Sequence, residues 1–226
     1  MNFFTKNITV IFVLLLICKP AFAQSDSGSE LIDYFYPISS EKIVYKYEDN
    51  RRDTSFIEYS VFWSIFNADT VLINELYSAD YELKVTRKYK VTKKGAFVQE
   101  LTLHNLDSGL SINDTFRIDK DTFMLFKSDT NSYMTTHNDG LSDVFSKKSI
   151  GGYGKYKWRD ETINSVVFNE LLWRKIDSSK QGVVEIESVY AKGMGLVSES
   201  WTSGFTRITE RRNLIDILKY RDWQKK

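Results

Sequence analysis

The sequence is poor in the residues on which metal sites, disulfides and nucleophilic catalysis depend. It has one cysteine, Cys18, and two histidines, His104 and His137, far apart along the chain. Zinc sites draw three or four ligands from histidine, cysteine and carboxylate, and a serine triad needs a histidine base. Neither an HExxH nor a GxSxG motif occurs. We therefore predict no catalytic residues, no cofactor, no metal ligands and no enzymatic activity.

Neither histidine has the surroundings of a metal ligand or a catalytic base. His104 lies on the polar face of a strand pattern that carries Leu101 and Leu103, which indicates a solvated side chain. His137 lies in the sequence THNDG, which is typical of a turn.

The apolar run near the start is too short to cross a membrane as a helix. It extends from Ile8 to Ile17, after Lys6 and before Ala21-Phe22-Ala23. A spanning helix needs roughly 20 apolar residues, whereas this layout is that of a secretory signal. We predict a signal peptide over residues 1–23, a disordered linker over residues 24–30, and no transmembrane segment after cleavage. The expected location is the periplasm or the outer membrane, with secretion as the alternative.

Cys18 offers a second interpretation, because bacterial lipoproteins are cleaved directly before a lipid-modified cysteine. Such signals have a small residue before the cysteine, whereas here Ile17 precedes it and Lys19 follows. We therefore expect Cys18 to leave with the signal and no lipid anchor to form. The mature chain then contains no cysteine, so its core must hold the fold without disulfides.

Neither sign of charge dominates the chain. The 31 basic residues include Lys6 and Lys19, so removal of the signal leaves 29 basic against 30 acidic residues. This balance gives no reason to predict nucleic acid or an anionic membrane as a partner. Aromatic residues make up 15% of the chain, and prolines number two. A composition rich in aromatic and β-branched residues favours strands.

The clearest periodic pattern lies in residues 80–95. Apolar side chains occupy odd positions and polar ones occupy every even position; the apolar set is Tyr81, Leu83, Val85, Tyr89 and Val91. Such alternation places one strand face on a core and the other in water. The turn Lys93-Lys94-Gly95 and the aligned Phe97, Leu101 and Leu103 then predict a β-hairpin.

Similar runs separated by turn residues recur along the chain and predict the fold. We expect an all-β, mainly antiparallel domain over residues 31–226, built as a curved sheet, half-barrel or barrel. From Ser128 to Asn164 the apolar pattern lapses, which predicts one long irregular loop. The last segment, NLIDILKYRDW, fits either a final strand or a short C-terminal helix.

Two glycine clusters could be mistaken for phosphate-binding loops. Gly193 and Gly195 lack the third glycine and the following helix of a dinucleotide fingerprint, so they predict a tight turn between strands. The cluster Gly151-Gly152-Tyr153-Gly154 lacks the Lys-Ser or Lys-Thr of a phosphate loop and indicates a flexible bend.

Among the tryptophans, Trp63 and Trp173 lie in strand patterns and are expected in the core. Trp158 is the best candidate for a surface contact.

Two short motifs resemble a family of bacterial envelope proteins. The segment VYAKGMGLV, from Val189 to Val197, is similar to a closing Tyr-Ala-x-Gly-x-Gly-Leu-Val motif of uncharacterised secreted or lipid-anchored proteins of Bacteroidetes-type bacteria. Tyr34-Phe35-Tyr36-Pro37 resembles their opening stretch, although the tryptophan or glycine that usually follows is absent at Ile38-Ser39-Ser40. The resemblance implies a strongly curved antiparallel sheet, similar in shape to periplasmic lipoprotein carriers, and implies no catalytic residues.

Three functional hypotheses remain open from the sequence. The first is a non-catalytic envelope protein whose curved sheet encloses a lipid or another hydrophobic small molecule. The second is a structural or interaction protein with a filled core and an envelope protein as its partner. The third is a polysaccharide hydrolase, for which no carboxylate pair stands out. A continuous apolar tunnel inside the sheet would favour the first hypothesis, and close-packed aromatic side chains would favour the second.

Overall fold

The computed structural model describes residues 31–51, 54–104, 114–126, 132–138, 143–176 and 179–225. The predicted signal peptide and linker, residues 1–30, lie outside the described residues.

One antiparallel sheet of twelve strands forms the body of the protein, in the order β6-β5-β4-β3-β2-β1-β12-β11-β10-β9-β8-β7. The strands are β1 (Ile43–Arg51), β2 (Thr54–Phe66), β3 (Thr70–Tyr77), β4 (Leu83–Val91), β5 (Gly95–Leu103), β6 (Asp114–Leu125), β7 (Ser132–Asn138), β8 (Asp143–Trp158), β9 (Glu161–Ile176), β10 (Ser179–Ala191), β11 (Gly195–Ser203) and β12 (Thr209–Lys219). The short helices η1 (Leu31–Tyr34) and α2 (Tyr220–Trp223) flank them. The predicted antiparallel, curved architecture is confirmed.

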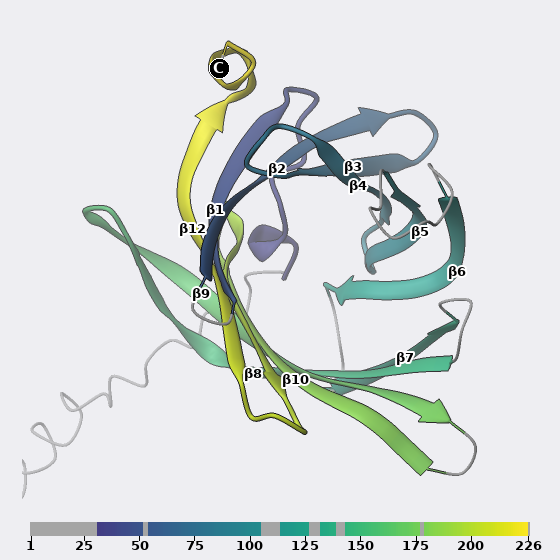
Figure 1. Ribbon diagram of the computed structural model, residues 1–226. Coiled ribbons are helices and arrows are strands. Elements are labelled where there is room, and N and C mark those ends of the chain that lie inside the picture. Colours follow the sequence, from purple (N-terminus) through teal and green to yellow (C-terminus); the bar gives the residue numbers. More distant parts are fainter. Residues whose placement is uncertain are drawn as a thin grey trace, which may run out of the picture.

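The sheet curls until its two edge strands face each other, but it does not close. β6 and β7 lie at opposite ends of the strand order and opposite each other in space (Figure 1). Side chains connect the two edges instead of a backbone ladder. The Lys148 ammonium donates to the Phe123 carbonyl over 3.0 Å, and the Tyr133 hydroxyl donates to the same carbonyl over 3.4 Å.

The alternation predicted for the hairpin of β4 and β5 is correct in its centre and wrong at its ends. Tyr89 and Val91 are buried in the core. Tyr81 precedes β4 with φ 62° and stacks on Tyr59, on the outer face of the sheet. A register shift between Val98 and Glu100 also puts Phe97 on the face opposite Leu101. A strand bulge reverses the facing of every later residue, which a strict period of two does not anticipate.

The predicted irregular loop from Ser128 to Asn164 is wrong, because β7, β8 and the start of β9 lie within it. The side chains of Ser146 and Lys148 are buried in β8, so polar residues take positions at which the pattern required apolar ones. The glycine cluster at residues 151–154 lies inside β8, and the pairing with β9 shifts register between Ile150 and Gly152. It is therefore a strand irregularity and not a flexible bend.

Both predicted alternatives for the C-terminal segment occur in succession, since β12 runs into α2. Trp223 of α2 is buried on the outer face of the sheet against Val44, Tyr59 and Val61. None of the helices in the described part of the chain has the length and apolarity needed to span a lipid bilayer.

Candidate binding site

The described chain before β1, residues 31–42, is called the N-terminal segment, and its helix η1 lies within the concave interior of the sheet (Figure 1). Phe35 is 1% exposed, and its ring lies 5.4 Å from that of Phe126 and 6.0 Å from that of Phe123. Tyr36 stacks on Phe62 with their ring centroids 4.0 Å apart. These contacts join the segment to β2, to β6 and to the residue just beyond β6, all in one half of the sheet. The interior is therefore partly filled by close-packed aromatic rings and is not one continuous apolar tunnel.

The turn between β10 and β11 holds this segment in place. Gly193 and Gly195 have φ values of 74° and 83°, so the predicted tight turn is confirmed. The Gly193 amide donates to the Asp33 carbonyl over 2.7 Å, and the Lys192 ammonium lies 3.2 Å from the Asp33 carboxylate. A Cβ atom on Gly195 would lie only 2.5 Å from the Tyr36 ring. The turn thus binds the protein's own N-terminal segment.

A cavity of about 320 Å³ remains in the interior beside Tyr36. Its apolar lining comes from the strands β2, β4, β5, β6 and β11: Phe62, Tyr89, Val98, Leu101, Phe123 and Leu196. Its polar lining comes from neighbouring strands and from the N-terminal segment: Ser60, Asn74, Arg87, Glu199, Arg212, Tyr190 and Tyr36. Such a mixed lining can hold a molecule that has both an apolar and a polar part.

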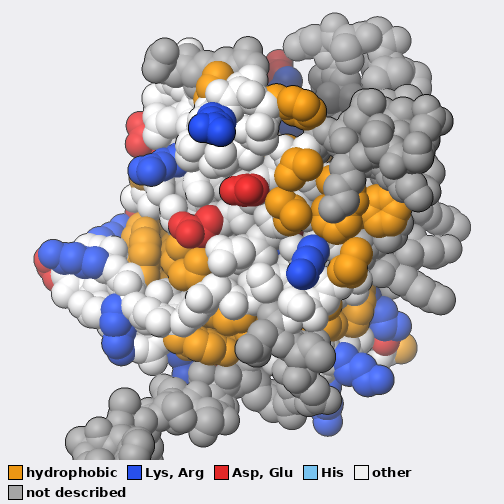
Figure 2. Space-filling model, turned by 90° about the horizontal axis from the view of Figure 1, so that it is seen from below, with side chains coloured by type: hydrophobic (Ala, Val, Ile, Leu, Met, Phe, Trp, Pro, Cys, Tyr) orange, Lys and Arg blue, Asp and Glu red, His pale blue; other side chains and the backbone are white. Residues whose placement is uncertain are grey.

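A second hollow, of about 500 Å³, is lined mainly by polar side chains of β8 to β11, including the exposed Lys147, Asn169 and Glu185. On the face shown in Figure 2, acidic and basic side chains are scattered between apolar patches and are not gathered by sign. We therefore take the interior cavity, with its buried charges, as the candidate binding site.

Most charges near the interior are held in ion pairs. The pairs are Arg51 with Asp49 at 2.7 Å, Arg212 with Glu58 at 3.4 Å, and Lys148 with Glu170 at 3.0 Å. Burial alone would lower the pKa of Lys148, but the Glu170 carboxylate, together with Tyr133 and Glu199, offsets this effect and raises that pKa above its ordinary value. A buried ion needs such a partner, because transfer out of water costs several kcal/mol per charge.

Two cationic side chains of the cavity have few hydrogen-bond partners among the described residues. Arg87 contacts the Asn74 side-chain oxygen at 3.5 Å, at the limit of a hydrogen bond. Arg212 uses one terminal nitrogen for Glu58 and Ser60, and its guanidinium lies 4.2 Å from the Tyr47 ring centroid. The Nε atom of Arg212 and the Nδ2 atom of Asn74 are buried without a hydrogen-bond partner in the described part of the chain.

Glu199 is the carboxyl group that lines the same cavity. Burial raises the pKa of Glu199 above its ordinary value of 4.5, although the hydroxyl of Ser188, 2.9 Å away, and the nearby Arg212 and Lys148 act against the shift. A raised pKa favours the neutral acid, so Glu199 compensates the cavity's cations less than an ordinary glutamate would.

The raised pKa predicts that Glu199 makes stability depend on pH. The folded state keeps the proton to a higher pH than the unfolded state, so the stabilisation is complete below pH 4.5, the ordinary glutamate pKa, and is lost as pH rises through the raised value. Glu199→Gln should remove this loss and raise the free energy of unfolding at neutral pH relative to wild type. Denaturant unfolding of Glu199→Gln and wild type, from below pH 4.5 to neutral pH, measures this difference in the free energy of unfolding.

Glu185→Gln is the control, because Glu185 is exposed on β10. Its pH dependence should match that of the wild type. Parallel pH curves for Glu199→Gln and wild type would show that Glu199 carries no shifted proton.

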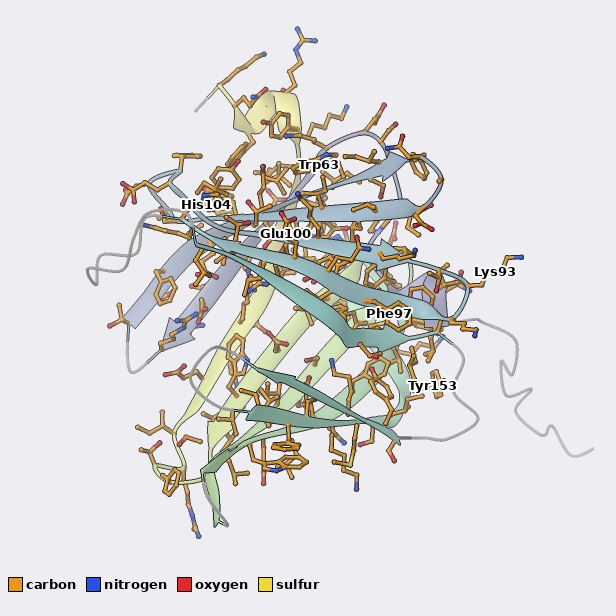
Figure 3. The ribbon with its side chains drawn as sticks, turned by 90° about the vertical axis from the view of Figure 1, so that its right-hand side faces the viewer. Trp63, Lys93, Phe97, Glu100, His104 and Tyr153 are labelled. Carbon is orange, nitrogen blue, oxygen red and sulfur yellow. The ribbon has the colours of Figure 1, made fainter. Side chains whose placement is uncertain are left out.

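The residues that the sequence singled out lie elsewhere. His104, just beyond the end of β5 (Figure 3), is half-buried, and its Nε2 atom lies 3.0 Å from the Thr86 hydroxyl, so the expected solvated position is wrong. His137 lies in β7 and not in a turn. No group of three or more histidine, cysteine or acidic residues is placed to hold a metal ion within the described ranges.

The two tryptophans predicted in the core are less buried than expected, and Trp158, predicted at the surface, is only partly exposed. Trp63 and Trp173 are half-buried, the first with the Lys42 ammonium 3.9 Å from its ring centroid and the second stacked on Phe145. Trp158 is also half-buried and packs against the core cluster, with Arg159 over its ring.

The sequence reasoning missed the charged residues of the cavity, although a signal for one of them was present. Arg87 occupies an odd position between Val85 and Tyr89 and interrupts the apolar face of the best-defined strand. A charged residue on a core-facing position is unusual unless it has a partner. Arg212 and Glu199 had no comparable signal, because the strands around them do not alternate cleanly.

The chain matches no known protein family, and no curated protein is detectably similar to it in sequence. Two solved structures are similar in fold. A candidate lipoprotein of Parabacteroides distasonis has 7% identity and a TM-score of 0.49, over 82% of this chain and 98% of that one. A candidate exported protein of Bacteroides fragilis with a YmcC-like fold has 8% identity and a TM-score of 0.44, over 82% and 99%. Neither likeness carries an argument about function, and the closing motif stays a prediction.

Proposed function

We propose that the protein is an exported, non-catalytic binding protein of the bacterial cell envelope that holds a small amphipathic molecule in its interior cavity. The observation that carries the proposal is the cavity itself, which the aromatic core leaves open. Leu101 and Phe123 contribute apolar surface to its lining, and Arg87 and Arg212 contribute cationic groups. Small-molecule sites combine such an apolar lining with a few polar groups that fix orientation. The export step rests on the predicted signal peptide.

The size of the cavity limits the ligand. Its volume of about 320 Å³ lies at the low end of the range for small-molecule sites. The N-terminal segment, through Phe35 and Tyr36, occupies the space that a larger ligand would need. We therefore expect a short, single-chain amphiphile and not a lipid with two long acyl chains.

Ligand binding should raise the thermal stability of the protein. Decanoic acid at about one hundred times its Kd should raise Tm by about 5 °C or more. Native mass spectrometry of protein purified from its own host should also show a small bound molecule. A clean apo mass, together with no change in Tm for any amphiphile, would overturn the proposal.

A matched pair of variants on one strand tests whether the interior cavity is the site. Leu101→Trp should fill the cavity and abolish the rise in Tm, since Leu101 lines it. Phe97→Trp should leave the rise unchanged, because Phe97 lies on the opposite face of β5 (Figure 3).

A second candidate function is supported by the aromatic packing. Phe35 and Tyr36 fill much of the interior, as a structural or interaction protein with a filled core would require. Such a protein would keep a stable envelope partner, whereas a binding protein would make transient contacts. Crosslinking in intact cells distinguishes the two.

A further inference from the structure

We propose that the interior cavity binds an anionic group, a carboxylate or a phosphate, through Arg87, Asn74 and Arg212. The inference rests on the proposed function, because it names the chemical class of the ligand's polar end. Three independent features of the cavity support it: its charge balance, its unused hydrogen-bond donors, and the register of β4 against β5.

One guanidinium of the cavity has no counter-ion among the described residues. The other two interior cations, Arg212 and Lys148, each have a carboxylate within 3.4 Å. Within the described part of the chain, Arg87 has no carboxylate at ion-pair distance, and its polar contact is the neutral Asn74 side chain. A half-buried cation without a counter-ion attracts an anion from solution, because the low-dielectric surroundings strengthen that attraction.

Two unused hydrogen-bond donors line the same cavity. Asn74 is 4% exposed, and its Oδ1 atom faces Arg87, which leaves the Nδ2 donor without a partner in the described residues. The Nε donor of Arg212 is also buried without a hydrogen-bond partner in the described residues. Both side chains line the cavity. Buried donors without acceptors weaken folding, and a carboxylate or phosphate offers several acceptor oxygens at once.

The register places charge and apolar surface side by side. Arg87 on β4 pairs directly with Leu101 on β5, and both line the cavity. An anionic head at Arg87 would therefore lie next to an apolar surface that extends over Leu101 towards Val98 and Phe123. This arrangement fits an amphiphile with an acidic head better than a free inorganic anion, which has no use for the apolar surface.

Isothermal titration calorimetry of the exported chain with three probes tests the inference. The probes are decanoic acid, decanol of the same chain length, and inorganic phosphate. Wild type should bind decanoic acid at least about tenfold more tightly than decanol, since charge-assisted hydrogen bonds are the stronger kind. Arg87→Met should abolish that preference, because it should weaken the binding of decanoic acid about tenfold or more and leave the affinity for decanol unchanged.

Two further variants keep the test independent of folding defects. Arg211→Met removes the same charge from an exposed neighbour of Arg212 and should leave all affinities unchanged. Asn74→Asp keeps Arg87 but supplies a carboxylate beside it. This carboxylate should compete with the acidic head of the ligand, so the affinity for decanoic acid should fall and the affinity for decanol should stay unchanged.

The outcomes separate the inference from the proposed function. Equal binding of decanoic acid and decanol, unaffected by Arg87→Met, would overturn the anionic site and leave an apolar binding cavity. Phosphate binding that depends on Arg87, without binding of either amphiphile, would support the anionic site and overturn the amphipathic ligand. Binding of none of the probes would overturn both.

Discussion

Replacing Phe35 by alanine is expected to lower the free energy of unfolding by about 3–5 kcal/mol, the usual cost of removing a fully buried aromatic ring. Phe35 is 1% exposed, and its ring contacts those of Tyr36, Tyr89, Phe123 and Phe126. These partners come from β4, from β6 and from beyond its end, so one side chain joins the N-terminal segment to one half of the sheet. Denaturant unfolding measures the loss.

Ile38→Ala provides the control for this loss. Ile38 lies three residues further along the same segment and is 36% exposed, so its truncation should cost less than about 1 kcal/mol. An equally small cost for Phe35→Ala would mean that the segment does not occupy the interior.

Replacing Gly195 by alanine should also be strongly destabilising, by about 2–6 kcal/mol. Two costs combine at this position. Its φ of 83° lies in the left-handed region, which costs a residue with a side chain about 1–3 kcal/mol. The new methyl group would also lie 2.5 Å from the Tyr36 ring, and such overpacking typically costs a further 1–3 kcal/mol or so. Denaturant unfolding of the variant measures the sum.

Gly193→Ala separates these two costs. Gly193 has a similar φ of 74°, but a Cβ atom there would have no neighbour within 4 Å. The Gly193→Ala variant should therefore show the backbone cost alone. In a double-mutant cycle, Tyr36→Leu should make Gly195→Ala milder and leave Gly193→Ala unchanged. Equal costs at the two glycines would show that Tyr36 does not pack against the turn.

Both predictions concern the N-terminal segment and its contacts with distant parts of the chain. The turn of Gly193 and Gly195 binds the segment of Asp33 and Tyr36, and the Tyr47 hydroxyl donates to the Leu196 carbonyl over 2.9 Å beside it. Tyr36 also lines the cavity. The position of the N-terminal segment therefore sets the size of the binding site as well as the stability of the fold.

The two motifs of the sequence resemblance meet in the structure. Tyr36 of the opening stretch packs on Gly195 of the closing stretch. The role of the glycines as a turn could be predicted, because the flanking residues are strand formers and no helix follows. The contact between this turn and the N-terminal segment could not be predicted, since no local pattern relates residues so far apart in the chain.

Local alternation by itself determined the antiparallel strands, the hairpin of β4 and β5 and the tight turn at Gly193 and Gly195. These features depend on neighbouring residues, whose side chains must point to opposite faces of a strand whatever the rest of the chain does. The same rule failed in β8, where buried Ser146 and Lys148 replace apolar residues, and at the bulge that turns Phe97 away from the core.

Only the tertiary structure decided what fills the interior and which charges remain there. Arg87, Asn74 and Arg212 come from β4, β3 and β12, and they meet because the sheet curls around β1 and brings separate strands to one cavity. Whether a buried charge has a partner depends on those long-range contacts and on no property of its sequence neighbours. The sequence thus specified the strands, and the curvature of the sheet determined the binding site.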